Sequence, residues 1–225
     1  MNASIIVAAG KGTRMGPNVD KLFLEVSGAP VIEHTWRAFD SHPEIDEIIL
    51  VVRSGLESAF HEIAQAAGFK KPWRLALGGQ ERQDSVANGL AALAPNTEIV
   101  AIQDGARPCT HASVISESIR AAREFGAAVA AQKVTDTIKE SLDGSVVSRH
   151  LDRSKLWAVQ TPQTFQVSLI KEALALVKAQ GLLVTDDTAA CELMGKKVKL
   201  VESAHPNPKV TVPSDLPYLE LLLRK

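Results

Sequence analysis

The sequence predicts an α/β fold in which a Rossmann-like, mainly parallel sheet is flanked by helices and carries a protruding β-hairpin dimerisation arm. Short apolar runs recur along the chain, and the segments between them have apolar residues at three- and four-residue spacing, as amphipathic helices do. A stretch rich in charged and turn residues, at about 133–155, interrupts this alternation. The length of 225 residues fits one domain, 1–225, that includes the arm.

Five apolar runs are predicted to be strands: Ile5–Ala8, Ile48–Val52, Leu75–Leu77, Ile99–Ile102 and Ala127–Ala131. Four intervening segments are predicted to be helices: Val31–Phe39, Leu56–Ala67, Gln83–Leu93 and Ala112–Phe125. Because strands and helices alternate, most strands should be parallel and helices should cover both faces of the sheet. Such sheets bind ligands at the carboxyl ends of their strands, so the turns after these runs are the first candidates for a binding site.

The polar stretch 133–153 contains a hairpin signal, Asp143-Gly144, between Thr137–Leu142 and Val146–Leu151. An isolated hairpin is only marginally stable in water. We therefore expect an extended arm that packs on another subunit.

The last third of the chain returns to the alternating pattern. Its predicted elements are a strand over Leu156–Phe165, a helix over Ser168–Gln180, a helix from the cap Thr185-Asp186-Asp187 to about Met194, short strands over Val198–Val201 and Val210–Val212, and a final helix over Ser214–Leu223 with Ser214 as its cap.

The composition excludes several classes of protein. With 25 Lys and Arg against 26 Asp and Glu, the formal net charge is -1, so the chain lacks the overall basic field that drives nucleic-acid binding. Cys109 and Cys191 are far apart without C-x-x-C spacing, which predicts a reducing compartment and neither a disulfide framework nor a zinc site. The run Ile5–Ala9 is too short for a signal or membrane segment. We expect a cytoplasmic protein with no nucleic-acid or membrane partner.

A glycine-rich turn follows the first apolar run. Gly10, Gly12 and Gly16 have the spacing G-x-G-x-x-x-G, one residue longer than the dinucleotide fingerprint, and the P-loop pattern is absent. Glycine lets the backbone approach a phosphate closely, and successive N–H groups form a positive concavity. Arg14 and Lys21 add the cations that a triphosphate requires. The turn is therefore a candidate triphosphate site, and the alternatives are a turn without a ligand and solvated surface charges.

A second glycine turn, Gly78-Gly79, follows another predicted strand and opens a helix. Backbone donors at the helix start, with Ser85 one turn in, are suited to bind the edge of a base or a ribose hydroxyl. The alternative is a capped helix in which Glu81 and Asp84 complement the helix dipole, and the local sequence favours neither.

The third candidate is the turn 103–108, with the sequence Q-D-G-A-R-P, after the strand Ile99–Ile102. Asp104 could hold a magnesium ion or a ribose hydroxyl, and Arg107 supplies another cation. Because each of the three turns follows a predicted strand, they should share one crevice. The alternative for this stretch is an ordinary turn.

These motifs together resemble those of a known family. From Ala8 to Asp215 the chain carries, in order, A-A-G-x-G-x-R-M-G with Lys21, G-G-x-E-R-Q-D-S-V, D-x-A-R-P, T-D-T-I-K, L-W-x-x-Q-T-P-Q-x-F, T-D-D and N-x-K-V-T-x-P-x-D. The set resembles the 2-C-methyl-D-erythritol 4-phosphate cytidylyltransferase family. The resemblance implies a single nucleotidyltransferase domain that transfers CMP from CTP to methylerythritol phosphate, releasing pyrophosphate, in the non-mevalonate route to isoprenoids. It also implies a homodimer whose arms cross to complete the partner's site.

The resemblance assigns expected roles to individual residues. Arg14 and Lys21 match the pair that binds phosphate and stabilises the transition state, while Arg153 and Lys209 match the positioners of the acceptor phosphate. The positions that match cytidine-binding ones are Ala8, Ala9, Gly10, Gly79, Gln80 and Ser85. Asp104 falls where the family contacts the ribose or metal region, and Arg107 where it contacts the acceptor. The remaining expected contacts lie on the arm and at its base: Thr135, Thr137 and Thr161.

Three positions depart from the family pattern. Asp20 stands where the family usually has proline, which predicts a less rigid approach to Lys21. Gly105 replaces the more usual alanine, and Pro208 lies inside the N-x-K motif. None of the three removes a charged group assigned to catalysis.

The hypothesis for the mechanism is an in-line attack by the acceptor's phosphate oxygen on the α-phosphorus of CTP. A phosphate monoester is largely ionised near neutral pH, so positioning and charge neutralisation should suffice. Mg²⁺ is the expected cofactor, bridging triphosphate oxygens, with Asp104 as its candidate ligand. Two other functions stay open on the sequence: a cytidylyltransferase for another polyol phosphate, such as ribitol 5-phosphate, and a non-catalytic nucleotide sensor. A Rossmann dehydrogenase fits less well, because the glycine spacing is wrong and no acidic residue after the second strand is well placed for a ribose.

Overall fold

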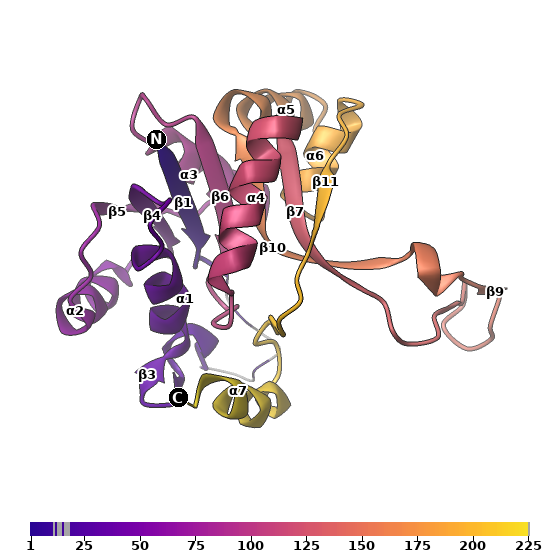
Figure 1. The fold of residues 1–225 in the computed structure, drawn as a ribbon, viewed down its shortest axis with the longest axis horizontal. Coiled ribbons are helices and arrows are strands. Elements are labelled where there is room, and N and C mark those ends of the chain that lie inside the picture. Colours follow the sequence, from indigo (N-terminus) through magenta and orange to yellow (C-terminus); the bar gives the residue numbers. More distant parts are fainter. Residues whose placement is uncertain (11, 13–14, 16–18, 225) are drawn as a thin grey trace.

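A seven-stranded sheet forms the centre of the molecule and has helices on both faces (Figure 1). The computed structural model describes residues 1–10, 12, 15 and 19–224. The strand order is β11-β7-β10-β6-β1-β4-β5. The strands are β1 (Asn2–Val7), β4 (Glu47–Val52), β5 (Trp73–Leu77), β6 (Ile99–Asp104), β7 (Ala127–Lys133), β10 (Trp157–Gln166) and β11 (Lys199–Glu202). The predicted α/β class is confirmed.

Most neighbouring strands are parallel, as the alternation of strands and helices predicts. β1 runs parallel to both β4 and β6, β4 to β5, and β7 to β11. β10 is antiparallel to β6 and β7. The arm connects β7 to β10, and Lys133 pairs with Trp157 where it leaves and rejoins the sheet, so the two strands run in opposite directions.

The helices divide between the two faces of the sheet. They are α1 (Val31–Asp40), α2 (Glu57–Ala67), α3 (Arg82–Ala91), α4 (Ala112–Phe125), α5 (Val167–Ala179), α6 (Asp187–Leu193) and α7 (Leu216–Leu223). One apolar core contains residues of α1, α2, α4 and α7, and the other contains residues of α3, α5 and α6. Trp36 and Phe39 of α1 are fully buried in the first core, and Phe165 of β10 is fully buried in the second. No described helix is long and apolar enough to cross a membrane.

Short elements complete the chain. They are the strands β2 (Glu25–Val26), β3 (Ala29–Pro30), β8 (Lys139–Glu140) and β9 (Arg149–His150), and the 3-10 turns η2 (Lys21–Phe23), η3 (Arg153–Lys155) and η4 (Pro213–Asp215). β2 pairs with β3, and β8 pairs with β9.

The arm projects from the body of the molecule, as Figure 1 shows for β9 and the chain around it. At its tip the Asp143 carboxylate accepts hydrogen bonds from the N–H groups of Ser145 and Val146, both at 2.9 Å. These bonds hold the pKa of Asp143 below its usual range. Leu142 and Val146 are 88% and 67% exposed. The predicted hairpin is therefore present, and it leaves apolar side chains uncovered within this chain.

The prediction of a strand over Val210–Val212 is wrong. The Val210 N–H donates to the Ala106 carbonyl at 2.9 Å. The N–H groups of Thr211 and Val212 both donate to the Asp215 carboxylate, at 2.6 and 2.9 Å. The backbone N–H groups of this segment thus bond to the carbonyl of a loop residue and to a carboxylate, and they form no ladder with a neighbouring strand.

The predicted cap of the last helix is also wrong. Ser214 lies inside η4 (Pro213–Asp215), and α7 begins at Leu216. The Asp215 carboxylate accepts the free N–H groups ahead of the helix. Asp215 occupies the N-cap position of α7, but its side chain bonds to the loop before η4 and not to the first turn of the helix.

The packing of β10 generates a test of stability. We expect Phe165→Ala to lower the free energy of unfolding by about 3–5 kcal/mol, because it leaves a cavity in a close-packed core. Leu183→Ala is the matched control, since Leu183 is 74% exposed. Urea denaturation followed by circular dichroism measures both, and equal effects of the two substitutions would contradict the assignment of Phe165 to the core.

Candidate functional site

A cleft of about 500 Å³ lies at the carboxyl ends of β1, β4, β5 and β6. The residues predicted from the sequence that line it are Ala8, Ala9, Gly10, Lys21, Gly79, Gln80, Ser85, Asp104 and Lys209. The three turns that follow predicted strands thus contribute to one cavity, as the rule for open α/β sheets requires.

The first glycine turn brings Lys21 into the cleft. Gly12 has a φ of +61°, a left-handed conformation that favours glycine. A Cβ atom there would lie 3.5 Å from the side chain of Lys21, so the turn and the lysine are close neighbours. The Lys21 ammonium donates to the Val210 carbonyl at 2.6 Å. Arg14 and Gly16 lie outside the described residues.

The second glycine turn is a tightly packed helix start. A Cβ on Gly79 would come within 2.2 Å of the Asp84 Cβ, so only glycine fits there without a shift. The Glu81 N–H donates to the Asp84 carboxylate at 3.0 Å, and the Gly79 N–H donates to the Ser85 hydroxyl at 3.0 Å. The Ser85 hydroxyl therefore fixes the conformation of the turn. The capped helix start, which was the alternative to a binding site, is present, and the same turn also lines the cleft. Its contact with a base stays a prediction.

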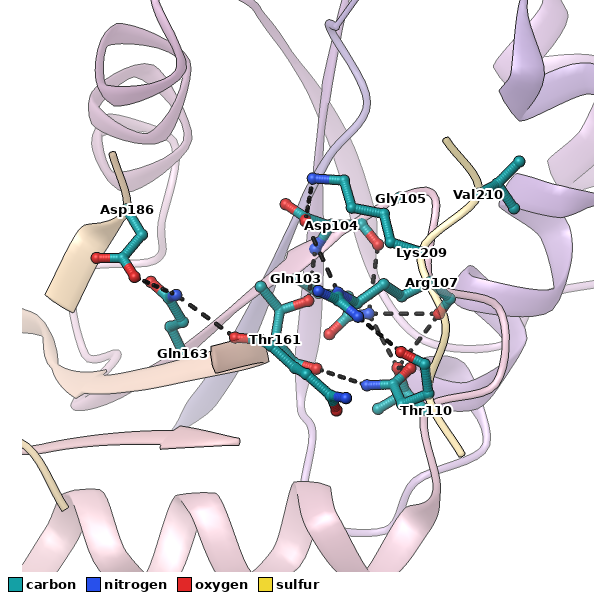
Figure 2. A network of polar contacts seen from close by, with 12 residues as sticks. Gln103, Asp104, Gly105, Arg107, Thr110, Thr161, Gln163, Asp186, Lys209 and Val210 are labelled. Carbon is teal, nitrogen blue, oxygen red and sulfur yellow. Dashed lines mark hydrogen bonds and ion pairs between the residues drawn. The ribbon is translucent and has the colours of Figure 1, made fainter. Parts of the chain in front are cut away.

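Asp104, at the end of β6, is the centre of the polar network in Figure 2. The Lys209 ammonium donates to its carboxylate at 2.6 Å. The Arg82 and Arg107 guanidinium groups lie 3.7 and 3.9 Å from it. Its backbone N–H donates to the Thr161 hydroxyl at 3.1 Å. One carboxylate thus connects three cations that are far apart in the sequence.

The charges around Asp104 decide its protonation state. Burial alone would raise the pKa of Asp104, but Lys209, Arg82 and Arg107 together hold it below the usual range. Burial lowers the pKa of Arg107, although the Asp104 carboxylate opposes that shift. Asp104 is therefore an anion at neutral pH.

Thr161 and Asn207 connect the cleft to the last strands. The ladder between β10 and β7 is irregular between Val159 and Gln163, a kind of interruption that re-aims side chains. Asn207 is buried; its side-chain amide donates to the Thr161 backbone carbonyl at 2.9 Å, and its backbone carbonyl accepts from the Arg107 guanidinium at 2.6 Å. The segment that carries Lys209 is thereby fixed against β10.

Arg82 and Asp187 form an ion pair that the sequence analysis did not assign to the site. The Arg82 guanidinium donates to the buried Asp187 carboxylate at 2.7 Å and lines the cleft. Burial raises the pKa of Asp187, and Arg82 opposes that shift. Asp186 caps α6 by accepting the Ala189 N–H at 2.9 Å. Only one of the two adjacent aspartates is therefore a cap, and the sequence carries no local signal that distinguishes them.

Arg53 was also missed, although a signal for it exists. It directly follows β4 and lines the cleft, so the same rule that identified Asp104 applies to it. Its guanidinium forms an ion pair with Asp20. The Asp20 carboxylate also accepts the Leu22 N–H at 3.2 Å. Asp20 therefore has two partners here, and the expected looser approach to Lys21 stays a prediction.

The arm residues lie apart from the cleft within one chain. Thr135, Thr137 and Arg153 are exposed, and none is among the described residues that line the cavity. Arg153 donates to the Thr135 carbonyl at 2.5 Å. The structure therefore does not bring Arg153 together with Lys209, its expected companion at the acceptor phosphate.

The structure explains why position 105 is a glycine in this chain. A Cβ at this position would lie 2.9 Å from Ile32 and 3.1 Å from the Val7 carbonyl. The Gly105 carbonyl accepts the buried Thr35 hydroxyl at 2.9 Å. The backbone approaches β1 and α1 too closely for alanine without a shift.

Asp104 is the candidate metal ligand. No group of three or more His, Cys, Asp or Glu suited to a metal ion occurs among the described residues. Mg²⁺ is commonly held by one or two carboxylates together with substrate phosphates. Asp104, an ionised carboxylate that lines the cleft, fits that mode.

The cysteines are not suited to nucleophilic catalysis. Burial raises the pKa of Cys109 to about 11 and contributes most to a pKa of about 12 for Cys191. A thiol with so high a pKa is protonated and weakly reactive at neutral pH. The cleft instead offers cations, which can bind a polyanion and stabilise charge that develops on it.

Comparisons with known proteins agree on one family. The family model described as IspD, 2-C-methyl-D-erythritol 4-phosphate cytidylyltransferase, matches residues 2–225. A protein of that name from Geobacillus kaustophilus is 44% identical over 220 residues, which cover 98% of this chain and 96% of the relative. Another from Caldanaerobacter subterraneus subsp. tengcongensis is 43% identical over 228 residues, covering 100% of both chains.

Solved structures give the same result. The crystal structure of 4-diphosphocytidyl-2C-methyl-D-erythritol synthase from Anaerococcus prevotii is similar with a TM-score of 0.88 at 33% identity, covering 100% of this chain and 96% of that one. The crystal structure of 2-C-methyl-D-erythritol 4-phosphate cytidylyltransferase from Thermus thermophilus is similar with a TM-score of 0.81 at 31% identity, covering 99% and 98%.

The charge network generates a pH-dependent prediction. Asp104→Asn removes the counter-charge of Lys209 and of the largely buried Arg107, so we expect it to lower the free energy of unfolding at pH 7 by about 3 kcal/mol. The pKa of Asp104 is lowered in the folded state, so its contribution is complete above the unfolded pKa of about 4 and is lost as the pH falls through the folded value. Urea denaturation at several pH values measures this.

The difference between the wild type and Asp104→Asn should therefore narrow in acid. Glu62→Gln, at an exposed position of α2, is the control and should change stability by less than about 0.5 kcal/mol. A difference that stays constant between neutral and strongly acid pH would show that Asp104 is not held by the surrounding cations.

Proposed function

Because the chain belongs to the 2-C-methyl-D-erythritol 4-phosphate cytidylyltransferase family, we propose that its cleft binds CTP and that the cations around Asp104 neutralise the phosphates. The enzyme transfers CMP from CTP to methylerythritol phosphate in isoprenoid biosynthesis. The observation that carries the assignment of roles is the convergence of Lys21, Arg82 and Lys209 on one cavity at the strand ends.

The reaction needs little help with proton transfer. The attacking group is the phosphate of the acceptor, whose second pKa is near 6 if it behaves like other phosphate monoesters. It is therefore largely ionised at neutral pH, and repulsion between two anions is the main obstacle. Neutralising and aligning them is the task of the protein.

Lys21 is proposed to contact the triphosphate. Its ammonium lies 2.6 Å from the Val210 carbonyl, so it is held in the cleft before the substrate arrives. A cation already in position stabilises charge that builds up on the α-phosphate and on the departing pyrophosphate. Arg14 is proposed to act beside it, on the motif match alone.

Lys209 is proposed to hold the acceptor phosphate. Its ammonium bonds to Asp104 at 2.6 Å, and its side chain is 38% exposed, so Lys209 is open to solvent while Asp104 keeps it in place. Asp104 is thus proposed to aim Lys209 and to leave one oxygen for a ribose hydroxyl or a metal ion.

Mg²⁺ is the proposed cofactor, held by Asp104 and the triphosphate oxygens. The bound ion would neutralise phosphate charge and make pyrophosphate a better leaving group. The residues of this chain position the phosphates around it.

The cytosine is proposed to bind at the second glycine turn. Gly79 and Gln80 line the cleft together with Ala8 and Ala9 of the first turn. Backbone groups of these small residues can approach a planar base closely.

The acceptor side is proposed to be completed by the arm of a second subunit. Arg153 lies at the base of the arm, outside the described lining of its own cleft. The apolar tip, with Leu142 88% and Val147 59% exposed, would be covered in such a homodimer. Exchange of arms would place Thr135, Thr137 and Arg153 at the partner's acceptor site.

The free thiols support a reducing compartment. Cys109 and Cys191 are both unpaired, as is usual for intracellular proteins of mesophiles. We propose the cytoplasm, where the substrates CTP and a sugar phosphate would be available.

Lys21→Ala tests the role of the first cation. We expect kcat to fall by about a hundredfold to a thousandfold, because one preorganised charge at the transition state is lost. Pyrophosphate release from CTP and methylerythritol phosphate measures it. Lys178→Ala, at an exposed position of α5, should behave as the wild type, and a Lys21→Ala enzyme as active as that control would refute the role.

Mixing two inactive variants tests the exchange of arms. In a dimer of one Lys21→Ala chain and one Arg153→Ala chain, arm exchange creates one site with both residues intact. An equimolar mixture, allowed to exchange subunits, should regain about one quarter of the wild-type activity. If each arm served its own subunit, both sites would be defective and the mixture would stay as inactive as the separate variants.

A further inference from the structure

Arg53 and Asp20 form a connection that the proposed mechanism does not use. Arg53 follows β4 and lines the cleft, and its guanidinium pairs with one oxygen of the Asp20 carboxylate. The other oxygen accepts the Leu22 N–H at 3.2 Å and caps the turn η2, which begins at Lys21. A single carboxylate therefore joins the end of a central strand to the turn that carries Lys21.

The turn is fixed from several directions. The Phe23 N–H donates to the Asp20 carbonyl at 3.1 Å, and Leu22 is buried in the apolar core. The side chain of Lys21 reaches the Val210 carbonyl at 2.6 Å. Asp20 connects this turn to the end of β4 through its ion pair with Arg53.

Asp20 also places a negative charge next to Lys21, a residue that lines the cleft. Its side chain is 20% exposed, and it directly precedes Lys21, which lines the cleft. An unpaired carboxylate next to a triphosphate repels it, and the repulsion is large where water is partly excluded. The side chain of Arg53, 29% exposed, cancels that charge.

We propose that Arg53 is a positioning residue for Lys21, which acts through Asp20 and at the same time masks the Asp20 charge from the triphosphate. This rests on the proposed role of Lys21. Without Arg53, the carboxylate keeps its bond to the Leu22 N–H but loses its tie to β4 and faces the nucleotide as a bare anion. CTP then binds more weakly, and Lys21 is less well aligned at the α-phosphate.

The competing explanation is that Arg53 itself contacts the triphosphate. The two explanations differ in what happens when the Asp20 charge is removed as well. If Arg53 acts through Asp20, then Asp20→Asn relieves the repulsion that Arg53→Met exposes, while the asparagine oxygen keeps the cap on Leu22. If Arg53 binds phosphate directly, the second substitution restores nothing.

Steady-state kinetics of the full-length enzyme with Mg²⁺, CTP and methylerythritol phosphate test the proposal. We expect Arg53→Met to raise the KM for CTP by about tenfold and to lower kcat by about fivefold, and the double variant with Asp20→Asn to bring the KM back to within about threefold of the wild type. Asp20→Asn alone should stay within about threefold of the wild type. In a Lys21→Ala background, Arg53→Met should change kcat by less than about twofold, because there is no ammonium left to position.

Arg74→Met is the matched control. Arg74 pairs with Glu47 at 3.1 Å at the opposite end of β4, away from the cleft, and its loss should leave the kinetics unchanged. Thermal denaturation of each variant reports on folding separately from kinetics.

Three results would overturn the proposal: wild-type kinetics for Arg53→Met, a raised KM for CTP in that variant that Asp20→Asn does not relieve, or an effect of Arg53→Met on kcat that is undiminished in the Lys21→Ala background. Failure of the proposed role of Lys21 is recognised differently, because Lys21→Ala alone would then be as active as the wild type. If Arg53→Met fails to fold, Asp20→Asn is the remaining test. A fall of more than about tenfold in its kcat/KM for CTP would contradict the charge-masking argument.

Discussion

The ion pair between Asp104 and Lys209 is the interaction on which the cleft depends. Asp104 ends the central strand β6, and Lys209 comes from the segment after the last strand. Their contact fixes the C-terminal segment against the sheet and gives Arg82 and Arg107 a common counter-charge. Without an anion among them, several cations in a partly buried cavity would repel one another. The carboxylate therefore holds these cations together at the cleft.

The construction of a parallel sheet explains which residues of the site could be predicted from the sequence. Apolar runs place the strands, and the topology of a parallel sheet gathers the turns at their carboxyl ends. Lys21, Gly79 and Asp104 were found in this way, and the structure places all three in one cleft. Lys209 and the arm residues carry no local signal, and only the resemblance to a family identified them.

The parts that sequence reasoning missed are long-range pairings. Asp187 looks like half of a helix cap until Arg82, 105 positions away, is seen beside it. The segment at Val210 has the composition of a strand, but its N–H groups are taken by Ala106 and Asp215. Asp20 stands where the family usually has proline, and its partner Arg53, at the end of β4, is 33 positions away. In each case a partner distant in the sequence decides the outcome, and local propensity cannot reveal it.

The central claim is that the cations of the cleft are in place before the nucleotide binds. A crystal structure with Mg²⁺ and a CTP analogue whose α,β-bridge resists cleavage tests this most directly. The account predicts the α-phosphate within hydrogen-bonding distance of the Lys21 ammonium, with Lys209 still on Asp104, Arg53 still on Asp20, and backbone shifts in the described cleft of less than about 1 Å. A triphosphate bound away from Lys21, or a cleft that forms only through rearrangement of the Asp104 network, would contradict it.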